Sequence, residues 1–190
     1  MKKTLVSLLA SLLALPALAH TDGAAHTHLS SFWDGALHPL TGPDHLAAML
    51  AVGVWSAMAL RRPLGAPLAF AASLLVGAVI AMRTGWAMPA LEASITVSLA
   101  VLGLLVALRT AMPPAAGAAT AAILAFSHGA AHGLELSGTA ALAGMVVSTL
   151  ALHAAGLGLG WKLRQSPILL RALLGASVAA LALARLNGVA

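Results

Sequence analysis

Six long apolar stretches run through this sequence, and they limit the folds that the chain can adopt. Each has close to the roughly 20 residues that an α-helix needs to cross the hydrocarbon core of a bilayer. Hydrophobic residues make up 61% of the chain and charged residues 8%, whereas soluble domains have roughly a quarter of their residues charged. We therefore expect an all-α fold, a polytopic membrane bundle of about six transmembrane helices. The expected spans are 32–60, 64–82, 92–109, 115–135, 139–161 and 167–186.

The N-terminal segment 1–19 has the features of a cleaved signal peptide. Lys2 and Lys3 form its positive region, residues 5–15 form an apolar region too short to span, and residues 17–19 form an A-x-A cleavage site. Cleavage there would leave His20 at the N-terminus, where its amine and imidazole together would chelate a metal ion. We divide the chain into a signal peptide (1–19), an external histidine-rich tail (20–31) and a six-helix transmembrane domain (32–190).

Basic residues between the spans predict the orientation of the helices. The positive-inside rule places short loops rich in lysine and arginine in the cytoplasm. Such loops follow the first, third and fifth spans, and their basic residues are Arg61, Arg62, Arg109, Lys162 and Arg164. Arg83 is the exception on the other side. With an exported N-terminus, we expect a multi-pass protein of the bacterial cytoplasmic membrane with both termini in the periplasm.

Composition also excludes several classes of function. The chain has no cysteine, which excludes disulfides and thiolate metal sites. Its basic residues stand singly or in pairs and its aromatic content is 4%, so we expect no nucleic-acid partner. It contains no Walker A motif, so we expect no nucleotide partner, and we expect no prosthetic group either. The lipid bilayer is the expected surrounding, and the sequence leaves the oligomeric state open.

Helix-breaking and ionisable residues are interleaved in the outer half of the first span. Proline removes a backbone donor and clashes with the preceding turn, so we expect a kinked or broken helix at residues 39–43. Membrane proteins tolerate such a break where the backbone is buried in protein or lines a cavity. Asp44 and His45 follow the break. Asp34 and His38 precede it with the four-residue spacing of one helix face. Because ionisable groups are costly in lipid, these side chains are candidates for a functional site.

The fourth span carries a second group of ionisable side chains. His128, His132 and Glu135 are spaced i, i+4 and i+7, so they project from one face of the helix. Two imidazoles one turn apart can bind one divalent ion, and a carboxylate on the next turn can ligate or orient it. His153 in the fifth span is a further candidate, and a packing role accounts for it equally well.

The ligand types narrow the choice of metal. Imidazole and carboxylate groups without a thiolate suit Ni(II), Co(II), Zn(II) or Cu(II) and disfavour Cu(I). The methionines are scattered along the chain, and we interpret them as packing residues. The tail histidines either gather metal ions at an entrance or belong to a solvated linker. The candidate metal ligands are His20, Asp34, His38, Asp44, His45, His128, His132, Glu135 and His153.

Residues 38–46, His-Pro-Leu-Thr-Gly-Pro-Asp-His-Leu, resemble the H-P-x-x-G-x-D-H-L signature of the HupE/UreJ nickel permeases. The leader, the histidine-bearing tail, the six spans and the histidine-rich fourth span extend the resemblance over essentially the whole mature chain. It implies a secondary transporter, not an enzyme, that moves Ni(II), with Co(II) as an alternative, inward for hydrogenase or urease maturation. It also implies that His38, Asp44 and His45 lie on the metal pathway, together with the ionisable residues of the fourth span.

Two other functions compete with metal transport. An intramembrane hydrolase could hold zinc with Asp44 and the three histidines of the fourth and fifth spans, and activate a water for attack on a lipid amide or peptide. Against it, the fourth span lacks the glutamate of the H-E-x-x-H motif that would act as base. A b-type haem protein would place axial histidines on facing helices and would be coloured when purified. We expect a transporter, whose energy coupling the sequence does not indicate.

Overall fold

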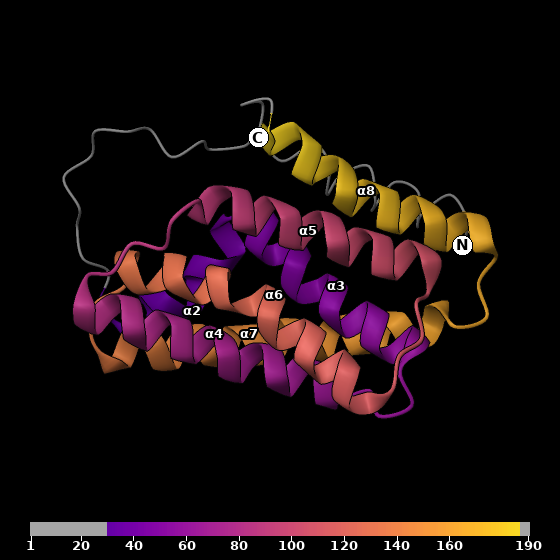
Figure 1. The fold of residues 1–190 in the computed structure, drawn as a ribbon. Helices are drawn as coiled ribbons and strands as arrows, with labels where there is room; N and C mark the ends of the chain where they lie inside the picture. The colour runs from indigo at the N-terminus through magenta and orange to yellow at the C-terminus, as the bar shows by residue number, and fades with distance from the viewer. Residues whose placement is uncertain (1–29, 187–190) are drawn as a thin grey trace.

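A computed structural model describes residues 30–186, and it folds them into a bundle of seven α-helices (Figure 1). In chain order they are α2 (Phe32–Thr41), α3 (Pro43–Ala59), α4 (Gly65–Thr84), α5 (Leu91–Leu108), α6 (Pro114–Glu135), α7 (Thr139–Leu163) and α8 (Ile168–Leu186). The expected all-α membrane bundle is confirmed, and the expected spans agree with these helices to within about two residues at each end. The predicted signal peptide and the tail residue His20 lie outside the described residues.

Four of the described helices, α4, α5, α7 and α8, are long and apolar enough to cross a membrane. The helix α6 has 22 residues and includes the histidine-rich stretch, which makes it more polar. The expected first span is divided between α2 with 10 residues and α3 with 17. The count of six spans therefore stays a prediction that depends on α6 and on α2 and α3 acting together.

The expected break in the first span falls at Gly42, the one residue between α2 and α3. Gly42 has extended backbone dihedrals (φ −92°, ψ 112°). Pro43 occupies the first turn of α3, where its missing N–H costs no intrahelical bond. Pro39 remains inside α2, and the hydroxyl of Thr41 donates to the carbonyl of His38 at 2.7 Å. The helix is thus interrupted at a single residue. The carbonyl of His38, close to the interruption, accepts a hydrogen bond from the hydroxyl of Thr41.

The central helix of the bundle is α3, which contacts each of the other six described helices. Met49, Val52 and Trp55 on this helix are 0% exposed. The indole N–H of Trp55 donates to the carbonyl of Thr110 at 2.8 Å, which ties α3 to the segment after α5. Because Asp44 and His45 lie in the first turn of α3, the central position of this helix holds its polar end inside the protein.

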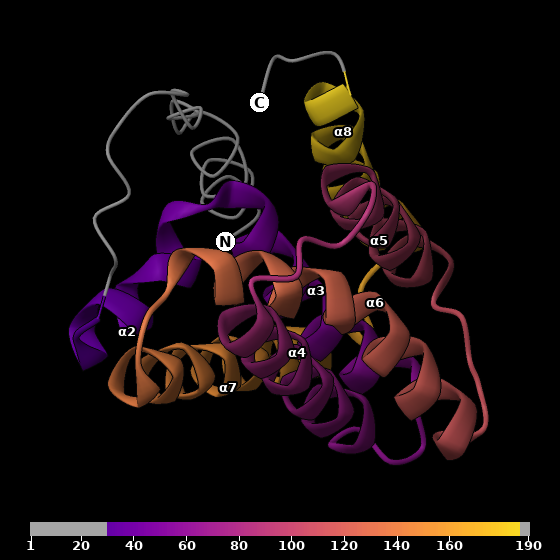
Figure 2. The ribbon, with the colours of Figure 1, turned by 60° about the vertical axis from the view of Figure 1, so that its left-hand side comes forward.

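Glycines let the helices pack closely, α4 with α6, α5 with α8, and α7 with both α2 and α3. Figures 1 and 2 both show α4 beside α6 and α5 beside α8. A Cβ added at Gly129 would collide with the carbonyl of Leu74, and one at Gly133 with the carbonyl of Ala78. Gly156 of α7 approaches the backbone of α3 in the same way. Small residues at interfaces are the usual means by which membrane helices pack closely.

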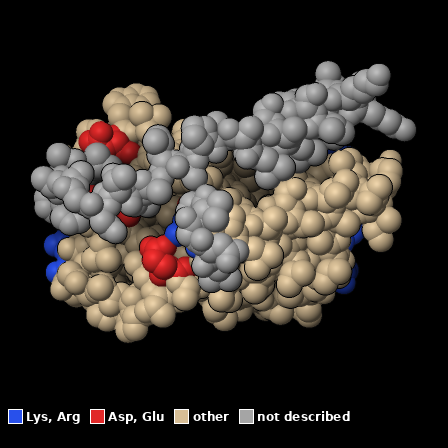
Figure 3. Space-filling model, turned by 90° about the horizontal axis from the view of Figure 1, so that it is seen from above, with Lys and Arg blue, Asp and Glu red and all other residues tan. Residues whose placement is uncertain are grey.

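Acidic side chains gather toward one end of the bundle, where Arg185 also lies, and other arginines lie at the opposite end. At one end, the Nε atoms of Arg109 and Arg164 donate to the carbonyls of Met58 and Ala57, at 2.8 and 2.7 Å, where α3 ends. The acidic side chains of the described residues lie toward the opposite end, and Figure 3 shows such side chains gathered in one half of the visible face. We call that end the acidic end; its residues are Asp34, Asp44, Glu92 and Glu135.

Candidate metal site

Side chains from the last turns of α2 and α6 meet at the acidic end and form a group of three ligand-type residues. The Nε2 atom of His38 lies 2.6 Å from Oε2 of Glu135. His132 completes the group, in which one ligand atom from each residue lies within 4.8 Å of the other two. The side chains of His38 and Glu135 are 13% and 39% exposed, whereas His132 is fully buried. An ion arriving from outside would therefore meet the partly exposed pair before the buried ring.

Two further imidazoles extend this group into the protein. The ring of His45 on α3 lies 4.3 Å from that of His132 and 5.1 Å from that of His128, measured between ring centroids. The rings of His38 and His132 are 4.9 Å apart. We call these four rings together with Glu135 the histidine cluster. The cluster joins the two segments that the sequence singled out separately.

The buried rings of the cluster have ring nitrogens for which the described residues supply no hydrogen-bond partner. These atoms are Nε2 of His45, Nδ1 of His128 and both nitrogens of His132. A buried polar atom without a partner costs free energy, and native proteins satisfy nearly all of them with protein, water or ions. Neutral imidazole nitrogens are common ligands of divalent transition metals. The chemistry of this donor set therefore suits a transition-metal ion.

A serine holds the innermost ring of the cluster. The Oγ atom of Ser98 on α5 lies 2.6 Å from Nε2 of His128, and both side chains are buried. This bond fixes the orientation of the ring, and its Nδ1 atom is buried with no hydrogen-bond partner among the described residues. Sequence reasoning missed Ser98, because an isolated serine in an apolar helix more often bonds its own backbone, as Ser98 also does to Ile95.

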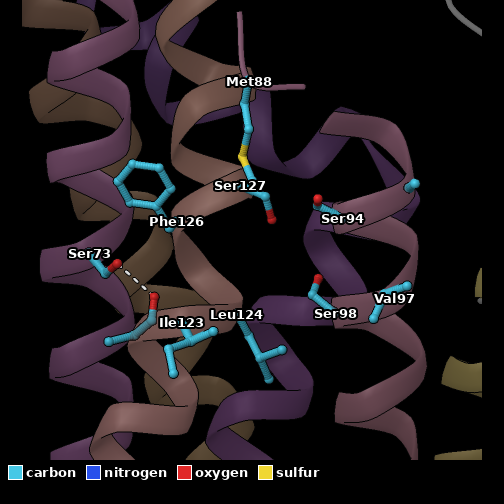
Figure 4. Close-up of a pocket in the computed structure, with 11 residues that line it drawn as sticks. Ser73, Met88, Ser94, Val97, Ser98, Ile123, Leu124, Phe126 and Ser127 are labelled. Carbon is cyan, nitrogen blue, oxygen red and sulfur yellow. Dashed lines mark hydrogen bonds between the residues drawn. The ribbon is translucent and has the colours of Figure 1, made fainter. Parts of the chain in front are cut away.

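A groove of about 730 Å³ between α4, α5 and α6 lies next to this serine (Figure 4). Figure 4 shows Ser94 and Ser98 on its α5 wall, and Ser73 donates from the α4 wall to the carbonyl of Ala122 at 2.7 Å. The rest of the lining is mostly apolar, with Val97 among its side chains. The groove offers no ligand set of its own, so the histidine cluster behind Ser98 remains the candidate site.

Asp44 lies at the edge of the cluster and has a second partner. Its Oδ1 atom lies 3.5 Å from Nδ1 of His45, and its Oδ2 atom lies 2.7 Å from a terminal nitrogen of Arg185. Arg185 also pairs with Glu92 at the start of α5. Sequence reasoning missed both Arg185 and Glu92. The available signal was the cost of a charged residue in an apolar helix, which applies to Arg185 in α8 as it does to Asp44.

The remaining predicted ligands lie apart from the cluster or outside the described residues. Asp34 forms a reciprocal helix cap with Ser31, with bonds of 2.9 and 3.0 Å between side chains and backbone N–H groups. His153 on α7 is buried against Phe70, with ring centroids 5.2 Å apart, and the same phenyl ring lies 5.9 Å from His128. A metal-binding role for Asp34, for His153 and for His20 stays a prediction.

An all-α bundle of apolar helices with ionisable side chains enclosed at one end defines the class of this protein, an integral membrane protein with a candidate ion site. Residues 8–185 match the HupE / UreJ protein family. The chain is also 36% identical over 168 residues to Protein HupE of Rhizobium leguminosarum bv. viciae, an alignment that covers 84% of each chain. The chain therefore belongs to the HupE/UreJ family, as its signature predicted. No solved structure matches it.

Proposed function

We propose that this chain is a permease that moves a divalent transition-metal ion, Ni(II) first among them, inward across the cytoplasmic membrane for hydrogenase or urease maturation. The observation that supports it is the histidine cluster, in which a carboxylate and four imidazoles from α2, α3 and α6 approach one another inside a membrane protein. Family membership supports the same function, because HupE/UreJ proteins are associated with nickel and cobalt supply to these enzymes.

The exposure of the cluster suggests the order in which an ion would meet its ligands. The pair His38 and Glu135 is partly exposed at the acidic end and would take the ion first. His132 is in contact with both His38 and His45 through its ring, so it would pass the ion inward. His128 lies beyond His45 and is oriented by Ser98. Each step exchanges bound water or one imidazole for the next without a change of metal oxidation state.

The distribution of charge supports the proposed direction. With the acidic end in the periplasm, the acidic residues would attract cations to the entrance, while Arg109 and Arg164 would lie at the cytoplasmic end of α3. Both termini would then be periplasmic. Metal ligands must be deprotonated to bind, so uptake is expected to weaken as the external pH falls through the range in which histidine is protonated.

The hydrolase alternative finds less support in the arrangement of its four residues. His153 lies against Phe70, and the ring of Phe70 also contacts His128. The two histidines are therefore linked through the phenyl ring, and not as neighbouring ligands of one ion. The carboxylate of Asp44 is paired with Arg185. A zinc site would need Asp44 and His153 to leave these contacts and join one ion.

Uptake of radioactive nickel into bacterial cells that lack their own importers tests the proposal. Cells that express the wild-type chain should accumulate nickel above the empty-vector control, and a His132→Ala variant inserted at the same level should not. A Ser177→Ala variant is the matched control, because that hydroxyl donates to the carbonyl of Leu173 within α8. Competition by excess cobalt, zinc and copper ranks the metals. Absence of uptake with a well-inserted protein would refute nickel transport.

A further inference from the structure

One arginine links three helices at the acidic end of the bundle. Arg185, near the C-terminus of α8, contacts Asp44 at the start of α3 at 2.7 Å and pairs with Glu92 at the start of α5. The planar guanidinium group can serve two carboxylates at once because it presents several N–H groups in a fixed fork. Figures 1 and 2 show α8 lying along α5, and this ion pair connects that helix pair to the central helix.

The two carboxylates bound by Arg185 differ greatly in their surroundings. The side chain of Asp44 is 4% exposed, whereas that of Glu92 is 74% exposed. A buried carboxylate is costly unless a positive charge or several hydrogen bonds compensate it. Arg185, at 19% exposure, supplies that charge from within the protein. Asp44 therefore has the guanidinium of Arg185 as its positively charged partner. Glu92 binds the same guanidinium from the solvent-exposed side.

The other oxygen of Asp44 lies beside one ring of the histidine cluster, that of His45. Its Oδ1 atom lies 3.5 Å from Nδ1 of His45, and the ring of His45 contacts those of His128 and His132. A divalent ion bound between Nδ1 of His45 and Oδ1 of Asp44 would use the same carboxylate that compensates Arg185. Two cations sharing one carboxylate repel each other strongly where little water screens them. Each would therefore weaken the binding of the other, by an equal factor in both directions.

We propose that Arg185 is a tethered cation that competes with the transported metal ion for Asp44 and so promotes release of the ion. This inference rests on the proposed function, metal transport through the histidine cluster. Transport requires binding that is favourable enough for entry and weak enough for exit. The histidine cluster, with its four imidazoles and Glu135, together with Asp44 would otherwise bind a transition-metal ion tightly. Return of the Arg185 guanidinium to Asp44 displaces the ion from that carboxylate and leaves it with fewer ligands in the cluster.

Equilibrium binding and transport should respond in opposite directions when the arginine charge is removed. The full chain is purified in detergent, nickel chloride binding is measured by titration calorimetry, and nickel uptake is measured in proteoliposomes. We expect Arg185→Gln to bind nickel about tenfold more tightly than the wild type and to transport it more slowly. Arg171→Gln, on the same helix, is the matched control and should match the wild type in both measurements. Unchanged or weaker nickel binding by a folded Arg185→Gln variant would overturn the proposal.

A second variant keeps the test decisive if Arg185→Gln does not fold. Glu92→Gln removes the negative charge that shares Arg185 with Asp44. The guanidinium should then bind Asp44 more strongly and compete more strongly with the metal ion for that carboxylate. We expect nickel binding about tenfold weaker than in the wild type. Binding as tight as in the wild type, or tighter, would contradict the competition.

The wild-type measurements separate failure of this inference from failure of the proposed function. If the wild-type chain neither binds nor transports nickel, the proposed function fails, and the role of Arg185 fails with it. If the wild type transports nickel and Arg185→Gln and Glu92→Gln do not change nickel binding in the expected directions, the transport function stands and Arg185 has only a structural role.

Discussion

At the scale of single residues, the candidate site depends on side chains held by partners from other helices. Glu135 on α6 is fixed against His38 on α2, and His128 on α6 is fixed by Ser98 on α5. Such partners decide which ring nitrogen carries the proton and which faces a bound ion. The residues that orient the ligands should therefore affect ion binding almost as strongly as the ligands.

Glu135→Gln tests the carboxylate of the cluster. Glutamine keeps the size and a hydrogen bond to His38, but it lacks the negative charge that attracts a divalent ion to the entrance. We expect nickel affinity to fall by about tenfold to a hundredfold, the range typical of lost ligand support. Titration of the purified variant with nickel chloride measures the change, with Ser177→Ala as the control. Wild-type affinity in Glu135→Gln would remove this carboxylate from the site.

Ser98→Ala tests the role of the serine that orients His128. Without the hydroxyl, the Nε2 atom of this buried ring loses its partner at 2.6 Å, and the ring is free to rotate. We expect the KM for nickel uptake to rise about tenfold or more. Ser94→Ala is the matched control, since Ser94 lines the same groove one turn away on α5 (Figure 4). Equal effects of the two substitutions would show that the groove, and not His128, is affected.

Helical spacing predicted part of the site, and chain topology determined the rest. The periodicity of His128, His132 and Glu135 was enough to place them on one face, because an α-helix has 3.6 residues per turn. The contact between His38 and Glu135 joins residues 97 positions apart in the sequence. Spacing within one helix cannot predict such a contact. The ion pair of Arg185 with Glu92 could not be predicted for the same reason, because the two residues are 93 positions apart.

At the scale of helices, close backbone contacts hold the cluster in place. The helix α6, which carries two histidines and Glu135, packs on α4 through glycines that leave no room for a Cβ. The interruption at Gly42 separately sets where α3 begins and hence where His45 lies. Prolines in the sequence predicted an interruption, but they did not predict its residue. Pro39 lies inside α2, where it removes one i→i−4 backbone bond, and the helix ends two residues later.

Gly129→Ala tests the packing of α6 on α4. The new methyl group would collide with the carbonyl of Leu74, so the helices must separate or the backbone must shift. We expect a loss of about 1–3 kcal/mol in stability, typical of overpacking, although alanine favours the helix by about 1 kcal/mol. The thermal unfolding midpoint in detergent, followed by tryptophan fluorescence, measures the loss.

Gly158→Ala is the matched control for that substitution, because no atom lies within 4 Å of the Cβ position at Gly158 on α7. Its unfolding midpoint should equal that of the wild type or exceed it slightly. If both variants lose the same stability, helix packing at Gly129 is not the cause.

At the scale of the whole molecule, the sequence predicted the helices better than their arrangement. The length of each apolar stretch follows from the thickness of a bilayer, so the helix bounds were predictable. The pairing of α4 with α6 and of α5 with α8 was not, because apolar faces offer little to distinguish one neighbour from another in lipid. Glycine positions distinguish them only after the helices are placed in space.

The orientation of the bundle in the membrane can be tested directly, because the chain has no native cysteine. Single cysteines are introduced at Ala87, in the loop between α4 and α5, and at Gln165, in the loop between α7 and α8; both residues are exposed. If the acidic end is periplasmic, a membrane-impermeant maleimide should label Ala87→Cys in intact spheroplasts. Gln165→Cys should be labelled only after the membrane is permeabilised. The reverse pattern would place the histidine cluster on the cytoplasmic side, and the same ligands would then serve export of the metal ion.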